Sequence, residues 1–88
     1  MTQGRFRLDK WLWVARFART RSMARAMCAS GLIRVGGVRV EKPGREIKTG
    51  DILTVPRPLA VLVVNVLANA ERRGSPEEAR RLYEILEG

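Results

Sequence analysis

The chain has 88 residues, enough for one small domain, and its 45% hydrophobic and 30% charged residues are typical of a folded protein. Seventeen Lys and Arg against nine Asp and Glu give a net charge of +8, which predicts an anionic partner, with nucleic acid as the first candidate. The lack of His and the single Cys exclude His-based catalysis, nearly all zinc sites and an internal disulfide, and no apolar run is long enough to span a bilayer. We therefore expect a monomeric, cytoplasmic binding module with no catalytic activity, metal, cofactor, small-molecule substrate or membrane attachment.

The positive charge is concentrated in the first two thirds of the chain. Residues 1–30 carry seven cations and one anion, and residues 31–58 carry six cations and three anions. Residues 59–88 carry four cations and five anions, so we expect the binding surface to lie before this last third.

Two short helices are predicted in the first third. The first runs from Leu8 to about Ala18, and Thr20 or Ser22 is suited to be the N-cap of the second, which Gly31 ends at the C′ position. The first helix has an apolar face of Leu8, Trp11, Leu12, Val14, Ala15 and Ala18, and the second has a buried side of Ala24, Met27 and Cys28. Cys28 is therefore expected to be an inert core thiol.

From Ile33 the apolar period changes to two, which indicates strands. A hairpin is predicted around the two-residue turn Gly36-Gly37, followed by strands over 52–55, ended by the Pro-Arg-Pro of 56–58, and over 61–67. Ser75-Pro76-Glu77-Glu78 is a capping box that starts a C-terminal helix, with an apolar stripe of Ala79, Leu82, Tyr83 and Leu86. The fold class is α+β: a small single domain in which two N-terminal helices pack on a short, mostly antiparallel sheet with a C-terminal helix.

Two pairs of like charges are the candidate binding groups. The hairpin turn places Arg34 directly opposite Arg39, an arrangement that is destabilising by itself. Arg21 and Arg25 lie one helical turn apart in a helix without acidic residues. Each pair either extends into water or contacts the phosphates of a nucleic acid, and the charge of +8 favours the second interpretation.

Trp13 and Phe17 lie one turn apart on the more polar side of the first helix, beside Lys10 and Arg16. Interleaved aromatic and cationic side chains can stack on bases. In so small a chain, however, large apolar groups are needed in the core, so we favour packing of both rings against the C-terminal strand or helix.

Four motifs in order resemble the S4 RNA-binding domain family and cover residues 7–55. They are Arg7-Leu8-Asp9-Lys10-Trp11-Leu12-Trp13, Thr20-Arg21-Ser22-Met23-Ala24-Arg25, Gly31-Leu32-Ile33-Arg34-Val35-Gly36-Gly37, and Lys42-Pro43 with Gly50-Asp51-Ile52-Leu53. Ala15-Arg16-Phe17, Glu71-Arg72-Arg73 and Leu82-Tyr83-Glu84 further resemble a ribosome-associated heat-shock branch of that family. The turn is Gly-Gly where the family usually has Asn-Gly, and the sequence ends at Gly88, before the long basic tail of that branch.

The resemblance implies the alpha-L motif and a set of RNA-binding residues. These are Arg7, Lys10, Arg21, Arg25, Arg34, Arg39 and Lys42, with Arg16, Arg19 and Trp13 as further candidates. Asp9 is expected to orient a neighbouring Arg or to cap the first helix. The implied partner is ribosomal RNA of the large subunit, in stalled-ribosome rescue, recycling or nascent-chain quality control, with peptidyl-tRNA as an additional candidate.

Residues 1–88 are expected to form one domain, with an S4-like core over 7–55 and a strand and helix over 56–88 that complete the fold. The starting Met and the capped terminal helix suggest a complete protein. Two alternatives stay open, namely a detached RNA-binding domain of an RNA-modifying enzyme and a protein-interaction module for an acidic partner.

Overall fold

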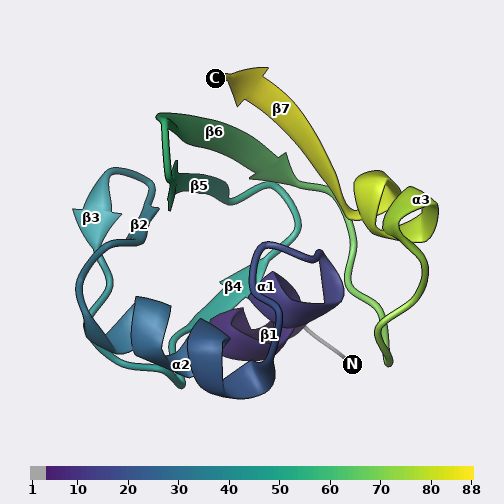
Figure 1. Cartoon of the computed structure of the whole chain (residues 1–88), viewed down its shortest axis with the longest axis horizontal. Helices are drawn as coiled ribbons and strands as arrows, with labels where there is room; N and C mark the ends of the chain where they lie inside the picture. The colour runs from purple at the N-terminus through teal and green to yellow at the C-terminus, as the bar shows by residue number, and fades with distance from the viewer. Residues whose placement is uncertain (1–3) are drawn as a thin grey trace.

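The computed structural model describes residues 4–88, and in it two helices lie beneath a five-stranded antiparallel sheet (Figure 1). The elements are β1 (Arg5–Arg7), α1 (Leu8–Val14), α2 (Arg21–Ala29), β2 (Arg34–Val35), β3 (Val38–Arg39), β4 (Glu46–Lys48), β5 (Ile52–Arg57), β6 (Ala60–Val66), α3 (Pro76–Ala79), the 3-10 turn η1 (Arg80–Leu82) and β7 (Tyr83–Glu87). The predicted α+β class, with N-terminal helices packed on an antiparallel sheet, is confirmed. No helix among the described residues has the length and apolar character needed to cross a membrane.

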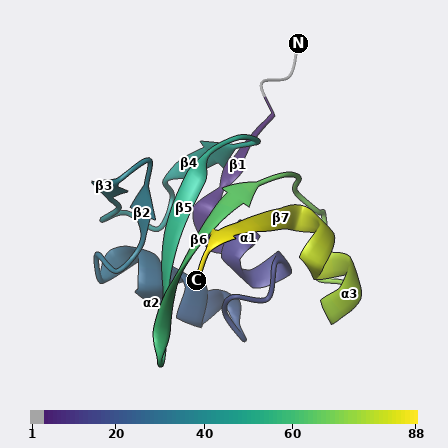
Figure 2. The same cartoon turned by 90° about the horizontal axis from the view of Figure 1, so that it is seen from above.

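The large sheet has the strand order β3-β2-β5-β6-β7, and α3 lies at the opposite end of the molecule from α2 in both views (Figures 1 and 2). The predicted hairpin is confirmed with its register, because Val35 pairs with Val38 and Arg34 with Arg39. A second sheet of β1 and β4 is not predicted by the sequence, since each strand has a single apolar residue between two charged ones. These two residues, Phe6 and Ile47, pair with each other.

The core lies between α1, α2 and the inner face of the large sheet. All six residues of the predicted apolar face of the first helix are buried, as are Ala24 and Cys28 of α2. Trp11 is fully buried, and its indole N–H donates to the carbonyl of Ala68 at 2.8 Å. Burying the donor with a partner avoids the penalty of an unpaired polar group, so residues after β6 complete the core around α1.

The first helix is shorter than predicted, because α1 ends at Val14 and not near Ala18. Arg16 adopts a left-handed conformation with φ of 67°, which a helix cannot include. The apolar pattern continues because Ala15 and Ala18 are buried in the turn that follows. This turn brings the ring of Phe17 to 5.8 Å from that of Trp11 and 4.8 Å from that of Tyr83, so the predicted packing of Phe17 is confirmed.

The predicted C-terminal helix is wrong beyond its first turn. The capping box at Ser75 is present, with Pro76 opening α3, but the helix passes into η1 and residues 83–87 form β7. The edge of β6 offers backbone partners along its length, so pairing with β7 outweighs the helical apolar pattern.

β5 continues through Pro56 to Arg57, where the sequence predicted its end at the Pro-Arg-Pro segment. β2 pairs with β5 only at Leu53 and Thr54, so β5 is an edge strand at Pro56. Proline is tolerated at such an edge, since the strand has no neighbour there that needs its missing N–H.

Candidate nucleic-acid interface

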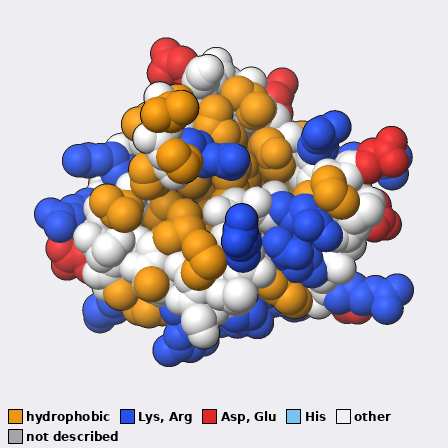
Figure 3. Space-filling view, viewed as in Figure 1, with side chains coloured by type: hydrophobic (Ala, Val, Ile, Leu, Met, Phe, Trp, Pro, Cys, Tyr) orange, Lys and Arg blue, Asp and Glu red, His pale blue; other side chains and the backbone are white. Residues whose placement is uncertain are grey.

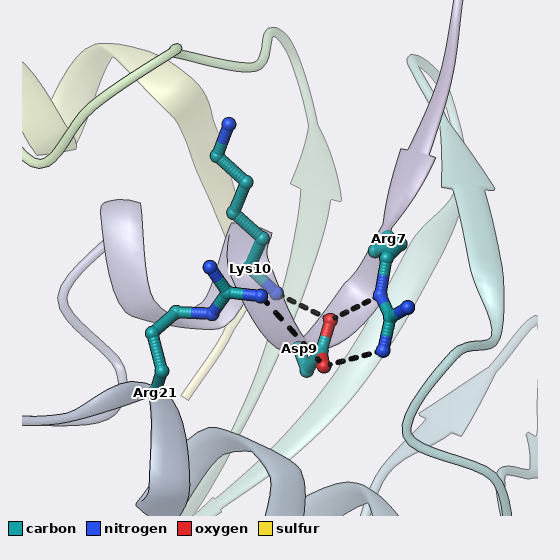
Figure 4. A network of polar contacts seen from close by, with 4 residues as sticks. All are labelled: Arg7, Asp9, Lys10 and Arg21. Carbon is teal, nitrogen blue, oxygen red and sulfur yellow. Dashed lines mark hydrogen bonds and ion pairs between the residues drawn. The ribbon is translucent and has the colours of Figure 1, made fainter.

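A buried carboxylate holds two of the predicted binding residues in place. Asp9, in the first turn of α1, is 0% exposed, and both of its oxygens accept from the Arg7 guanidinium, at 3.1 Å from Nε and 2.9 Å from Nη2 (Figure 4). The Arg21 guanidinium at the start of α2 approaches the same carboxylate at 4.0 Å. The backbone N–H of Lys10 donates to it at 2.7 Å, whereas the Lys10 side chain points away (Figure 4). The expected orienting role of Asp9 fits this geometry.

The electrostatics of this cluster favour the charged form of Asp9. Burial alone would raise the pKa of the carboxyl, but the hydrogen bonds from Arg7 and Lys10 and the charges of Arg7 and Arg21 outweigh it and hold the pKa below its ordinary value. The same contacts raise the pKa of Arg7, first through the hydrogen bond to Asp9 and then through its charge. Asp9 is therefore ionised at neutral pH and links β1, α1 and α2.

Both arginines of this cluster keep part of their guanidinium available. The side chain of Arg7 is 50% exposed and that of Arg21 is 43% exposed. A guanidinium has five N–H donors, so the contacts with Asp9 leave donors for an anion outside. Because its side chain is already held, each arginine loses less freedom on binding a ligand.

The β2–β3 hairpin carries the second cationic pair, Arg34 and Arg39, directly opposite each other. Arg34 donates to the carbonyl of Gly37 at 3.3 Å, within the turn. The Arg39 side chain lies against Gly31, which has φ of +79°, and a Cβ at Gly31 would collide with its guanidinium. Neither arginine forms an ion pair with an acidic residue within the described part of the chain.

A shallow groove of about 490 Å³ lies along the segment that leads from the β2–β3 hairpin towards β4. Lys42 is one of its lining residues, together with Arg39, Val40, Glu41, Gly44 and Arg45. The guanidinium of Arg7 lies beside Gly44, within 3.8 Å of where a Cβ would stand. The backbone N–H of Leu8 also donates to the carbonyl of Arg45 at 2.8 Å, so this loop lies beside Arg7, although the sequence motifs did not single out Arg45.

Arg25 is exposed on α2 one turn after Arg21, and α2 has no acidic residue in its first turn. Thr20, one of the two predicted caps, is the N-cap and accepts from Met23 N–H at 3.0 Å. Lys and Arg side chains lie around the rim and also in the centre of the face seen in Figure 3, while apolar side chains gather over the upper centre and acidic ones at the edges. The seven predicted residues thus come from β1, α1, α2, the hairpin and the loop after β3.

The three additional candidates are placed differently. Arg16 donates twice to the carbonyl of Gly74, at 3.1 and 2.8 Å, while Arg19 is exposed in the loop before α2. Trp13 is half-buried, and the guanidinium carbons of Arg21 and Arg73 each lie 5.9 Å from its ring. The sequence linked Arg73 only to the heat-shock branch, because nothing in the local pattern shows that it contacts α1.

Cys28 lies beneath this surface on the buried side of α2. Burial raises the pKa of its thiol to about 11, with the charge of Asp9 adding to the shift, so the thiol is neutral at physiological pH. Among the described residues, no three His, Cys, Asp or Glu side chains are grouped to hold a metal ion.

Comparisons with known proteins agree on one family. The S4 domain family matches residues 6–53. The heat shock protein 15 homolog of Aeromonas salmonicida is 41% identical over 98% of this chain and 64% of its own length. The RQC P-site tRNA stabilizing factor of Halalkalibacterium halodurans is 37% identical over 90% of this chain and 88% of its own length.

The fold has a counterpart among solved structures. The trimeric structure of heat shock protein 15 from Vibrio cholerae matches with a TM-score of 0.86 and 34% identity, over 92% of this chain and 81% of that one. The chain spans less than two thirds of the length of the curated heat shock protein 15 relatives, at 58 to 66% of their residues.

Proposed function

The chain belongs to the S4 domain family, as its motifs predicted, and we propose that its basic face binds structured RNA. The observation that carries this proposal is the cross-strand pair of Arg34 and Arg39, which repel each other and have no acidic partner among the described residues. A phosphate between them would remove this repulsion. The proposed basic face consists of Arg7, Lys10, Arg21, Arg25, Arg34, Arg39 and Lys42.

The layout of these cations favours a folded RNA over a long single strand. They project from short, mutually packed elements, and Asp9 holds two of them in a fixed geometry. Double-stranded RNA is recognised mainly by its shape and backbone, which a rigid set of cations can match without reading bases. Phe17, one of the two aromatic side chains considered for base stacking, is instead packed against Trp11 and Tyr83.

The RNA that we propose is ribosomal RNA of the large subunit, on stalled ribosomes during nascent-chain quality control. Relatives named heat shock protein 15 and RQC P-site tRNA stabilizing factor support this assignment. The second name makes peptidyl-tRNA a further proposed contact. The protein would act in the cytoplasm as a binding factor with no catalytic step.

We propose that one copy of the chain binds the RNA, because the basic face lies on a single chain. The Vibrio cholerae relative is trimeric in its solved structure. Sedimentation of the purified protein alone and with RNA distinguishes the two states, since a trimer would bring three basic faces into one complex.

Cosedimentation with purified bacterial large ribosomal subunits tests the function. The wild type should sediment with the subunits, and Arg21→Glu with Arg25→Glu should abolish this, since two phosphate contacts become repulsions. The matched control is Arg80→Glu with Arg81→Glu, which changes the net charge equally at the other end of the molecule (Figures 1 and 2). A control that loses as much binding would refute the proposed face.

Salt dependence and subunit preference complete the test. If about five to seven cations contact phosphates, log K should fall against log salt with a slope of roughly −4 to −6. In gradients of cell lysate, the protein should be enriched at the large-subunit peak, and more so after translation is stalled. A profile confined to the small subunit would reject the large-subunit assignment.

A further inference from the structure

Arg73 lies outside residues 6–53, the part matched by the S4 family, yet it makes two long-range contacts with the helical region. Its Nε donates to the carbonyl of Trp13 at 3.0 Å, and its Nη2 donates to the carbonyl of Ala18 at 3.3 Å. The first carbonyl belongs to α1, and the second lies within the turn between α1 and α2. Arg73 therefore connects the end of α1 and this turn to the C-terminal segment.

A second pair of hydrogen bonds connects the same two segments, this time with the donor in the turn between α1 and α2. Arg16, within the same turn, donates twice to the carbonyl of Gly74, the neighbour of Arg73. Arg16 has a positive φ of 67°, which is unfavourable for a residue with a Cβ unless its surroundings fix it. The turn between α1 and α2, which immediately precedes the N-cap of α2, and the segment around Arg73 thus stabilise each other's conformation.

The ring of Trp13 connects Arg73 with the proposed RNA face. The guanidinium carbon of Arg73 lies 5.9 Å from the centre of the ring, and that of Arg21 lies at the same distance of 5.9 Å. Arg21 also approaches the buried carboxylate of Asp9 at 4.0 Å. Its side chain is therefore held between an aromatic ring and a carboxylate.

We propose that Arg73 is a positioning residue that fixes Trp13, so that Trp13 in turn holds Arg21 ready to contact an RNA phosphate. This inference rests on the proposed RNA binding by the basic face. It gives the C-terminal segment, whose residues 59–88 carry four cations and five anions, a role in the affinity of a surface built by the N-terminal helices.

The physical basis is the freedom of a long side chain. An unrestrained arginine loses rotamer freedom when it binds, and holding it beforehand should improve affinity by about threefold to tenfold. A lysine at position 73 keeps the charge, but it lacks the planar group that can stack on an indole while donating to two carbonyls. Arg73→Lys therefore loosens Trp13 without changing the net charge of the protein.

A double-mutant cycle on large ribosomal subunits tests the proposal. The fold loss of affinity caused by Arg21→Ala should be about three times smaller in the Arg73→Lys background than in the wild type, because Arg21 is then no longer held in place. Arg25→Ala is the matched control, since Arg25 lies one turn further along α2 and should lose the same factor in both backgrounds. Arg72→Lys, at the exposed neighbour of Arg73, should leave the Arg21 effect unchanged.

The outcomes separate this proposal from the proposed function. If Arg21→Ala and Arg25→Ala both bind as the wild type does, the proposed RNA face is wrong. If Arg21→Ala weakens binding equally in both backgrounds, Arg73 does not position Arg21 and only the present inference is overturned. Should Arg73→Lys prove unfolded in thermal melts, Trp13→Leu replaces it, because it removes the ring and keeps an apolar side chain, and the same reduced Arg21 effect is expected.

Discussion

Arg7 and Arg21 share one buried carboxylate, whereas Arg34 and Arg39 face each other across a hairpin with no acidic partner among the described residues. In the first pair, folding itself fixes the position of the cations, and Asp9 cancels half of their charge. In the second pair both charges stay uncompensated, and backbone groups are their neighbours. The first pair is thus suited to set the geometry of a complex, and the second to supply electrostatic attraction.

The largest effect is expected at the carboxylate of the first pair. Asp9→Asn should lower the free energy of unfolding by about 2 to 3 kcal/mol, less than the roughly 3 to 5 kcal/mol of a fully buried ion pair, because both arginines are half-exposed. Chemical denaturation measures this, and RNA binding should fall as well. Asp51→Asn, at a pair in which Lys48 is exposed and Asp51 is partly exposed, should lower the free energy of unfolding by less than about 1 kcal/mol. Equal effects of the two variants would show that burial of Asp9 is unimportant.

The pH dependence of stability should report on the same carboxylate. Its pKa is lowered in the folded state, so its stabilising contribution is present above the ordinary value and is lost as the pH falls through about 4 and below. The difference in unfolding free energy between the wild type and Asp9→Asn should therefore shrink in acid. Denaturation series at several pH values measure it, and a constant difference down to pH of about 3 would contradict the lowered pKa.

Substitution of the hairpin pair should affect RNA affinity much more than stability, in contrast to Asp9→Asn. Arg34→Gln with Arg39→Gln should leave the unfolding free energy within about 0.5 kcal/mol of the wild type, because a repulsion is removed and no buried contact is lost. RNA affinity should fall about tenfold, and the salt slope should become shallower by about 2. Titrations at several salt concentrations measure both. An unchanged slope would mean that this pair does not contact phosphates.

The smallest effect is expected at the hairpin turn. Gly36 has φ of +58° with open space around its missing Cβ, so Gly36→Asn should raise the unfolding free energy by about 0.5 kcal/mol and leave RNA binding unchanged. Gly36→Val is the contrasting variant, because a β-branched residue is strained at positive φ and should destabilise the protein. Thermal melts rank the three proteins, and a destabilised Asn variant would contradict the turn geometry.

Local signals in the sequence predict much of this fold. The Gly-Gly turn predicts the hairpin and its register, and Thr20 and Ser75 predict two helix starts. Features that depend on distant partners escape such signals. The end of α1 depends on a left-handed Arg16 bound to Gly74, and β7 depends on the free edge of β6.

The same distinction between local sequence signals and contacts with distant partners applies to the candidate site. The family motifs select Asp9 and most cations of the proposed basic face, because these residues lie within short, ordered patterns, and the hairpin register adds Arg39 opposite Arg34. They miss Arg45, whose backbone lies beside Arg7 through the β1–β4 pairing, and Arg73, whose partner Trp13 is 60 residues away. Contacts between residues so far apart in the sequence can be identified only from the folded structure.

The hydrogen bond from Trp11 to Ala68 bears on how this unit could be transplanted. Residues 6–53 carry the family pattern, yet the buried indole of Trp11 finds its acceptor after β6, and β5 continues to Arg57 with β6 as its longest neighbour. A graft of that segment alone onto another protein would leave the Trp11 donor buried without an acceptor, cut β5 after Leu53 and remove the strand that pairs with it. Any fusion that borrows this surface would therefore need the C-terminal strands as well, or a host able to replace them.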